Sequence, residues 1–286
     1  MFGIPATILW AIGSMAALGL LFGVGLVLAA RKFRPREDAR IGKALGHLPG
    51  VNCAACGYAG CHSYAEALAA GEKVTLCAAG GPDVASALAD VMGVEVGEVR
   101  RQRAVLHCQG GTRRCGDRFE YVGLEDCRAA HIISGGPKAC TYGCLGMGSC
   151  ARACPFGAIS MSEERLPTID AAKCTGCGTC VRTCPRNLLG LLPVEYKVYL
   201  GCASHDKGEA VKDVCSVGCI ACGLCAKNEP RYAIQLMGNL PVLDYAKAQG
   251  DFRKAAEACP MNCFVIEEGE GAAVPLAALS QEVKEA

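Results

Sequence analysis

The feature that most constrains this chain is its cysteine content. Of its 286 residues 22 are cysteine, against seven phenylalanines and one tryptophan. With so few large aromatic side chains, something besides a hydrophobic core must hold the fold together. Disulfides, zinc sites or iron–sulfur clusters could do this, and the spacing of the cysteines distinguishes them. The 29 basic and 28 acidic residues nearly balance, so the charge does not indicate nucleic acid as a partner.

The first thirty residues predict a single-pass membrane anchor. Residues 4–30 carry no charge, and such a helix is long enough to cross the roughly 30 Å core of a bilayer. A signal peptide, the alternative, would have a basic start and a shorter apolar stretch. Four basic residues follow at positions 31, 32, 34 and 36, so the positive-inside rule predicts an outside N-terminus and a cytoplasmic remainder. That compartment is reducing, which disfavours disulfides.

The first cysteine group follows this segment with the spacing C-x2-C-x4-C-x15-C. Gly57 and Gly60 let the backbone turn closely around a cluster. A zinc knuckle usually has two C-x2-C pairs, whereas this group has one, so we expect a [4Fe–4S] cluster. Residues 63–70 predict a short helix, and residues 83–106 predict one or two helices packed under this module. The expected ligands of the first cluster are Cys53, Cys56, Cys61 and Cys77.

The most specific motif is C-x2-C-x2-C-x3-C-P, which begins at Cys174. In this bacterial ferredoxin run the first three thiols ligate one cluster and the fourth ligates the other. An upstream group with the spacing C-x3-C-x5-C-x3-C-P is its partner, so crossing the fourth ligands predicts two [4Fe–4S] clusters. The second cluster takes Cys140, Cys144, Cys150 and Cys184, and the third takes Cys154, Cys174, Cys177 and Cys180.

The ferredoxin motif then recurs in a degenerate form. Residues 167–174 (PTIDAAKC) align with residues 241–248 (PVLDYAKA), and Glu229 stands where the fourth cysteine of the new unit is expected. Residues 248–254 also contain no cysteine, where the last repeat should have three. The missing positions are the ligands of one cluster, whereas all the ligands of the other cluster are present. This pattern predicts a fourth cluster and leaves Cys263 as a spare thiol. The ligands of that cluster are Cys219, Cys222, Cys225 and Cys259.

Five cysteines lie outside these sets. Four of them could ligate a fifth cluster, and ordinary buried thiols are the alternative. The spacing does not decide which four would be ligands, so the chain is expected to carry four to five [4Fe–4S] clusters. The five are Cys108, Cys115, Cys127, Cys202 and Cys215.

These patterns predict an α+β chain with small ferredoxin-like domains behind a transmembrane helix. The chain has no acid–base pair, activated nucleophile or dinucleotide fingerprint, so no catalytic residue is expected. The expected segments are an anchor over 1–30, a 4Fe–4S domain over 31–82, a helical linker over 83–139, a ferredoxin-like domain over 140–200, a degenerate ferredoxin-like domain over 201–268 and a tail over 269–286.

The anchor, the first cysteine group and the ferredoxin core together resemble the B subunit of the Rnf (Rsx) complex, a membrane-bound ion-translocating ferredoxin:NAD oxidoreductase. The stretches GGPKACTYGCLGMGSC at 135–150 and DKG at 206–208 are similar to the longer, anaerobe-type members. Those members carry a complete last ferredoxin pair, which this chain lacks. The resemblance implies a translocase subunit of the inner membrane that takes electrons from reduced ferredoxin and passes them to membrane partner subunits. A membrane-tethered polyferredoxin that serves another redox enzyme, such as a hydrogenase, is the alternative, and a zinc scaffold is a third interpretation.

Overall fold

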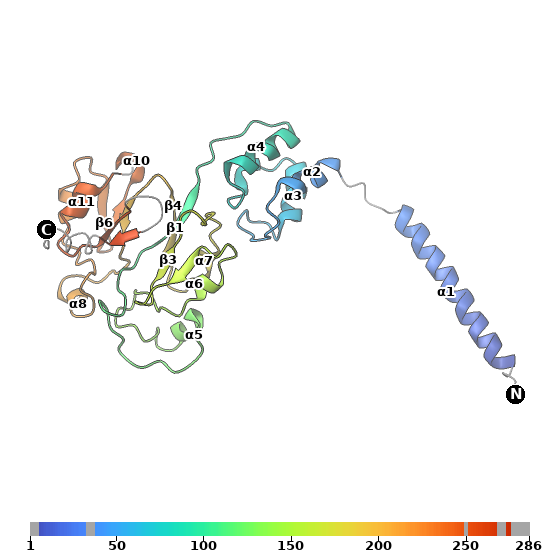
Figure 1. Ribbon diagram of the computed structural model, residues 1–286, viewed down its shortest axis with the longest axis horizontal. Helices are drawn as coiled ribbons and strands as arrows, with labels where there is room; N and C mark the ends of the chain where they lie inside the picture. Colours follow the sequence, from blue (N-terminus) through green and yellow to red (C-terminus); the bar gives the residue numbers. More distant parts are fainter. Residues whose placement is uncertain (1–5, 33–37, 249–250, 268–272, 276–286) are drawn as a thin grey trace.

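The computed structural model describes residues 6–32, 38–248, 251–267 and 273–275. A long helix stands apart at the N-terminal end, and a small helical module lies between it and the rest (Figure 1). A ferredoxin core follows, and a second ferredoxin unit occupies the other end of the molecule (Figure 1). The mixed helices and short antiparallel strands confirm the predicted α+β class.

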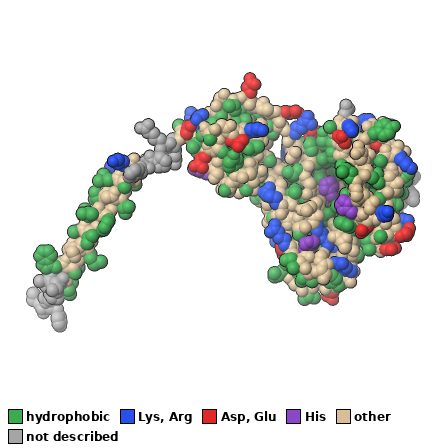
Figure 2. Space-filling model, turned by 180° about the vertical axis from the view of Figure 1, so that it is seen from behind, with side chains coloured by type: hydrophobic (Ala, Val, Ile, Leu, Met, Phe, Trp, Pro, Cys, Tyr) green, Lys and Arg blue, Asp and Glu red, His purple; other side chains and the backbone are tan. Residues whose placement is uncertain are grey.

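Helix α1 spans Ala6–Lys32 and contains 27 residues. At 1.5 Å per residue it is about 40 Å long, more than a bilayer core requires. Within it, Trp10–Lys32 has a mean hydropathy of 2.2 and is long and apolar enough to cross a membrane. Apolar side chains surround the helix and basic ones mark its C-terminal end (Figure 2). The other two basic residues of the orientation argument, Arg34 and Arg36, lie outside the described residues.

The helical module begins at Asp38, whose carboxylate caps helix α2 (Ala39–His47) by accepting the N–H of Arg40 at 2.9 Å. Its core buries Tyr64, Leu68 and Leu88. Because Leu88 belongs to this core, the module runs past the expected boundary at residue 82 to the end of α4. Its elements are α2 (Ala39–His47), α3 (Cys61–Ala69), the 3-10 turn η1 (Val74–Leu76) and α4 (Gly81–Met92).

The ferredoxin core consists of two antiparallel strand pairs with three short helices. Strand β1 (Gln102–Leu106) pairs with β4 (Leu189–Pro193), so the expectation of helix up to residue 106 is wrong beyond Met92. Of the expected helical linker, only α4 and α5 are helices among residues 83–139. The remaining elements are α5 (Cys127–Ile132), α6 (Ser149–Arg152), β2 (Ile159–Met161), β3 (Pro167–Ile169) and α7 (Thr179–Thr183).

The second ferredoxin unit repeats this plan. Its hairpin β6–β7 corresponds to β2–β3, and a separate antiparallel sheet has the order β5-β8-β9. The elements are β5 (Val198–Leu200), α8 (Glu209–Lys212), α9 (Leu224–Lys227), β6 (Ile234–Met237), β7 (Leu240–Leu243), α10 (Tyr245–Ala248), α11 (Arg253–Glu257), β8 (Phe264–Glu267) and β9 (Ala273–Pro275).

The fourfold repeat is visible in the backbone. Gly157, Asn187, Tyr232 and Asn262 each lie three residues after the fourth ligand position of a repeat, with φ between +49° and +59°. Each N–H donates to the carbonyl three residues earlier. This left-handed conformation is unusual for a tyrosine. Its recurrence shows that the repeat with Glu229 in place of cysteine keeps the ferredoxin turn.

A buried ion pair joins the ferredoxin core to the second unit. Arg103 on β1 donates to the carboxylate of Glu267 on β8 at 2.5 Å, and their side chains are 4% and 10% exposed. The same guanidinium donates to the carbonyl of Tyr196 at 3.1 Å. A buried carboxylate without its partner is costly, so this pair fixes how the two units pack.

We expect Arg103→Ala to destabilise the folded protein by about 3–5 kcal/mol, because it leaves Glu267 buried and unpaired. Arg113 is the matched control, since its pair with Glu164 leaves the Arg113 side chain 77% exposed. Arg113→Ala should cost at most about 1 kcal/mol. Denaturant unfolding of the anaerobic protein, followed by visible absorbance and circular dichroism, measures both. Equal midpoints for the two variants would contradict the assigned role of the buried pair.

Candidate iron–sulfur centres

The first thiol group lies in the helical module, where the loop before α3 and the segment after η1 meet. Cys53, Cys56, Cys61 and Cys77 line one pocket, as predicted from their spacing. The carboxamide of Asn52 accepts the N–H of Cys61 at 2.8 Å and so holds the loop closed. Burial raises the pKa of Cys77, and the thiols of Cys61, Cys53 and Cys56 raise it further. All four expected ligands therefore surround the same space.

A second group forms around the loop that precedes α7. Burial raises the pKa of Cys180 to about 12, and the nearby thiols of Cys174 and Cys177 add to the rise. Cys154 packs in the same apolar cluster as Cys174 and Cys180. Gly176, between the first two cysteines, has φ +70°, and a Cβ there would lie 2.6 Å from the carbonyl oxygen of Gln102. The tight loop thus requires glycine at this position.

The neighbouring group differs from the sequence prediction. Its pocket is lined by Cys127, Cys144, Cys150 and Cys184, while Cys140 lines another pocket. Burial raises the pKa of Cys150 to about 11, and Cys127 is the nearby thiol that raises it most. Three of the four expected ligands of the second cluster are therefore together. The structure places Cys127 where Cys140 was expected.

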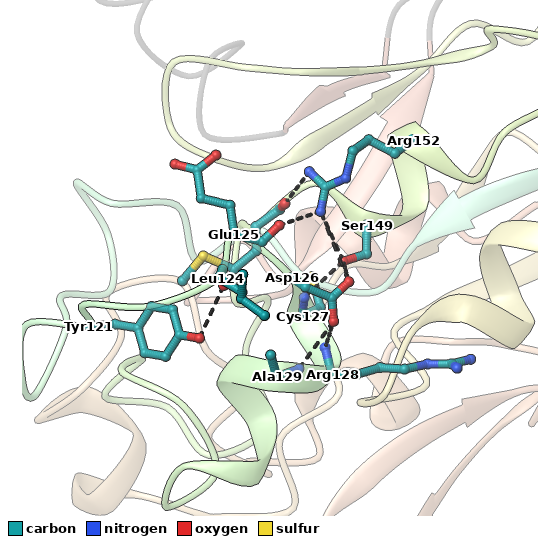
Figure 3. A network of polar contacts seen from close by, with 10 residues as sticks. Tyr121, Leu124, Glu125, Asp126, Cys127, Arg128, Ala129, Ser149 and Arg152 are labelled. Carbon is teal, nitrogen blue, oxygen red and sulfur yellow. Dashed lines mark hydrogen bonds and ion pairs between the residues drawn. The ribbon is translucent and has the colours of Figure 1, made fainter.

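A polar network explains how Cys127 reaches this pocket (Figure 3). The N–H of Cys127 donates to the hydroxyl of Ser149 at 2.8 Å, and that hydroxyl donates to the carboxylate of Asp126 at 2.8 Å. Asp126 also caps α5 by accepting the N–H of Arg128 at 2.9 Å. The guanidinium of Arg152 donates to the carbonyl of Glu125. These contacts tie the segment before α5 to the start of α6.

The sequence contains a signal for this exchange. Counted back from Cys154-Pro155 at strict ferredoxin spacing, the three preceding ligand positions are Cys150, Met147 and Cys144. Met147 is buried and carries no thiol, so the repeat lacks its second cysteine. A ligand from outside the repeat is then needed.

The group in the second ferredoxin unit contains one thiol more than predicted. Its pocket is lined by the expected ligands Cys219, Cys222, Cys225 and Cys259, and also by Cys263. The N–H of Cys263 donates to the sulfur of Cys259 at 3.4 Å. Leu188 has the same relation to Cys184, at 3.5 Å, and is a buried core residue. Cys263 therefore occupies a core position of the repeat, which favours its interpretation as a spare thiol.

A fifth group lies in a pocket between the core and the second unit. Gly110 is at its centre, because a Cβ there would lie 3.4 Å from the sulfur of Cys215 and 3.8 Å from that of Cys108. Cys115 hydrogen-bonds Cys215, which lowers the pKa of Cys115 to about 6 and raises that of Cys215. Burial raises the pKa of Cys108, and the ammonium of buried Lys138, which donates to the carbonyl of Gly111 at 3.2 Å, opposes that rise and adds to the lowering of the Cys115 pKa. The thiols lining the pocket are Cys108, Cys115, Cys140, Cys202 and Cys215.

The backbone around these groups suits cluster-bound thiolates. N–H groups donate to the sulfur of Cys174 from Ala104 at 3.4 Å, and to that of Cys108 from Cys144 at 3.4 Å. Hydrogen bonds of this kind stabilise the charged form of a thiol. Burial opposes it, raising the pKa of Cys144 to about 12, so a bound metal would be needed to hold this thiol as a thiolate. No three His, Cys, Asp or Glu side chains of the described residues are placed to hold a single metal ion.

A cavity outside these thiol groups is a separate feature. It has a volume of about 400 Å³ and lies between the β2–β3 hairpin and strands β5 and β8. Cys108 is the one cysteine in its lining, so it is not a sixth thiol group.

Comparison with known proteins agrees with the motifs. A family described as "Putative Fe-S cluster" matches residues 48–78, and one described as "4Fe-4S dicluster domain" matches residues 139–188. The B subunit of the Na(+)-translocating ferredoxin:NAD(+) oxidoreductase complex of Acetobacterium woodii is 40% identical, over 90% of this chain and 77% of the relative. The B subunit of the ion-translocating oxidoreductase complex of Methanosarcina acetivorans is 41% identical, over 82% of this chain and 90% of the relative.

The chain belongs to the family of B subunits of ion-translocating oxidoreductase complexes. The corresponding B subunit of the proton-translocating ferredoxin:NAD(+) oxidoreductase complex of Clostridium ljungdahlii is 43% identical, over 83% of this chain and 84% of the relative. The family matches confirm the Rnf-type resemblance and [4Fe–4S] clusters as the cofactors. They also support membrane association and other subunits of such a complex as partners.

We expect Cys127→Ser to remove or convert one cluster to a three-iron form, and Cys259→Ser to do the same to a different cluster. Cys263→Ser, the matched control beside Cys259, should leave the iron content unchanged because its thiol fills a core position. Iron and acid-labile sulfide analysis with electron paramagnetic resonance (EPR) of the anaerobic proteins measures all three. Full iron in Cys127→Ser would return Cys140 to the second set.

Proposed function

We propose that this Rnf-type B subunit accepts electrons from reduced ferredoxin and delivers them to membrane partners in a ferredoxin:NAD oxidoreductase. Family membership together with five separate thiol groups is the observation that carries the proposal. One group lies in the helical module that follows the anchor helix and another lies in the second ferredoxin unit, at the other end of the molecule from that helix (Figure 1). The complex as a whole would be the translocase, with ion movement and NAD reduction on other subunits.

Four of the proposed ligand sets follow the pockets, and the set of Cys154, Cys174, Cys177 and Cys180 keeps the crossed ligands expected from the sequence. Cys202 is left out of the fifth set because it accepts the N–H groups of Ser204 and Cys219, at 3.5 and 3.3 Å, and so lies toward the second unit. The five sets are Cys53, Cys56, Cys61 and Cys77; Cys127, Cys144, Cys150 and Cys184; Cys154, Cys174, Cys177 and Cys180; Cys219, Cys222, Cys225 and Cys259; and Cys108, Cys115, Cys140 and Cys215.

The chain's own residues would hold and tune these centres. When bound, [4Fe–4S] clusters supply one-electron transfer at potentials from about −700 to +450 mV, set by charge, hydrogen bonds and exposure. Apolar neighbours such as Leu106 and Leu188 keep water from the ligands of the core. Lys138 places a buried positive charge beside the fifth group and would favour its more reduced state. Cys222 is exposed, so the fourth centre would be the one most open to an external protein.

The anaerobic full-length protein should contain about 20 iron atoms, four for each of five clusters. Reduced ferredoxin should bleach its visible absorbance, and NAD-dependent reoxidation should require the companion subunits. Fewer than about 12 iron with stoichiometric zinc would exclude the cluster assignment. Full iron content with reduction by a hydrogenase but not by ferredoxin would favour the alternative polyferredoxin.

The orientation in the membrane is a separate expectation. Basic residues at the end of α1, Arg31 and Lys32, should keep that end on the cytoplasmic side. A reporter fused after Ala286 should therefore be active only in its cytoplasmic form. Activity of a periplasm-dependent reporter at the same site would reverse the orientation.

A further inference from the structure

Two arginines occupy the same position in the two repeats of the ferredoxin core. Arg152 on α6 lies four residues after Gly148, and Arg182 on α7 lies four residues after Gly178. The guanidinium of Arg152 donates to the carbonyl of Met147 at 2.9 Å, and that of Arg182 donates to the carbonyl of Cys177 at 3.4 Å. Each arginine therefore donates a hydrogen bond to the ligand loop of its own repeat.

Each guanidinium also contacts the hydroxyl at the start of its own helix, Ser149 or Thr179, at 3.5 and 3.4 Å. The remaining hydrogen bond of each guanidinium goes to a residue outside the repeat. Arg152 donates to Glu125, two residues before the thiol Cys127 that completes its centre (Figure 3). This arrangement of a hydroxyl residue and an arginine therefore attaches a ligand-bearing segment from outside the repeat to a ferredoxin loop.

The outside segment held by Arg182 comes from the helical module. The guanidinium donates to the carbonyl of Cys53 at 3.0 Å. Within residues 38–93 of the described chain, Cys53 is the one residue found hydrogen-bonded to the ferredoxin core. Helix α7 lies on the side of the core that faces the module (Figure 1). A link this small leaves a module free to move unless a specific contact fixes it.

The third repeat lacks this arrangement of a hydroxyl residue and an arginine. After Gly223, the residues at the corresponding positions are Leu224 and Lys227. A leucine has no hydroxyl, and an ammonium lacks the rigid planar fork with which a guanidinium donates to two carbonyls at once. Lys227 is exposed, so it offers a matched control at the same place in the repeat.

We propose that Arg182 is a positioning residue that docks the helical module on the ferredoxin core, with the loop of Cys53 against the loop of Cys177. This inference rests on the proposed function, because it makes the first and third centres direct electron-transfer neighbours. One electron leaves one centre and reduces the other, and no proton moves and no bond forms or breaks. The anchor-proximal module would then exchange electrons with the core through α7 rather than through α6.

The test uses the fully reduced, full-length protein. Neighbouring paramagnetic clusters broaden each other's EPR signals, so the wild type should show spin–spin interaction between the first and third centres. Arg182→Ala should lower the equilibrium constant for docking about tenfold, which corresponds to about 1.4 kcal/mol, near the lower end for a hydrogen bond from a charged donor. The interaction should weaken accordingly while iron, sulfide and the shape of the isolated signals stay unchanged. Arg182→Lys should restore it only in part.

The controls separate this inference from the function on which it rests. Lys227→Ala should keep both the iron content and the interaction, whereas Arg152→Ala should alter the centre of Cys127 and leave the interaction in place. The docking role would be overturned if Arg182→Ala kept the wild-type broadening or if Arg182→Lys restored the spin–spin interaction in full. It would also be overturned if Lys227→Ala weakened the interaction as much as Arg182→Ala does. Low iron in the wild type would instead overturn the proposed function.

Discussion

The interaction on which the rest of this structure depends is the hydrogen bond from a backbone N–H to the side chain at the fourth ligand position, found in three of the four repeats. The N–H four residues later donates to that side chain in Cys184, at 3.5 Å, and in Cys259, at 3.4 Å. The turn between them always places its third residue in the left-handed region. Because this geometry belongs to the backbone, it positions a thiolate without relying on a large hydrophobic core.

The same constraint explains how one repeat persists without its cluster ligand. Glu229 accepts the N–H of Ala233 at 2.6 Å, the bond that a cysteine sulfur accepts elsewhere, and is 3% exposed. Burial acts to raise the pKa of Glu229, but hydrogen bonds from Ala233 and Arg231 lower it overall, so the carboxylate keeps its charge. Arg231 also donates to the carbonyl of Asp251 at 2.6 Å. Buried Phe252 and neighbouring alanines fill the last repeat, so apolar packing there replaces cluster ligation.

The segments outside the ferredoxin repeats join the parts of the chain. The loop that carries Cys108 and Cys115 packs against the one that carries Cys215, so the fifth thiol group lies where the core and the second unit meet. The ion pair of Arg103 and Glu267 closes the same junction from the strand side. A centre at this junction would link the two ferredoxin units, just as the contact of Arg182 would link the core to the module.

The sequence by itself determined the anchor helix, the ferredoxin repeats and the thiol groups whose members share a loop. Within one short loop the spacing leaves the chain almost no freedom, so C-x2-C-x2-C brings its thiols together wherever it occurs. Only the tertiary structure showed that Cys127, and not Cys140, lines the pocket of Cys144, Cys150 and Cys184, that residues 102–106 form a strand, and that Leu88 packs in the core of the first module. A thiol that joins a group from far along the chain is placed by packing and polar contacts, such as those around Ser149, and spacing does not encode them.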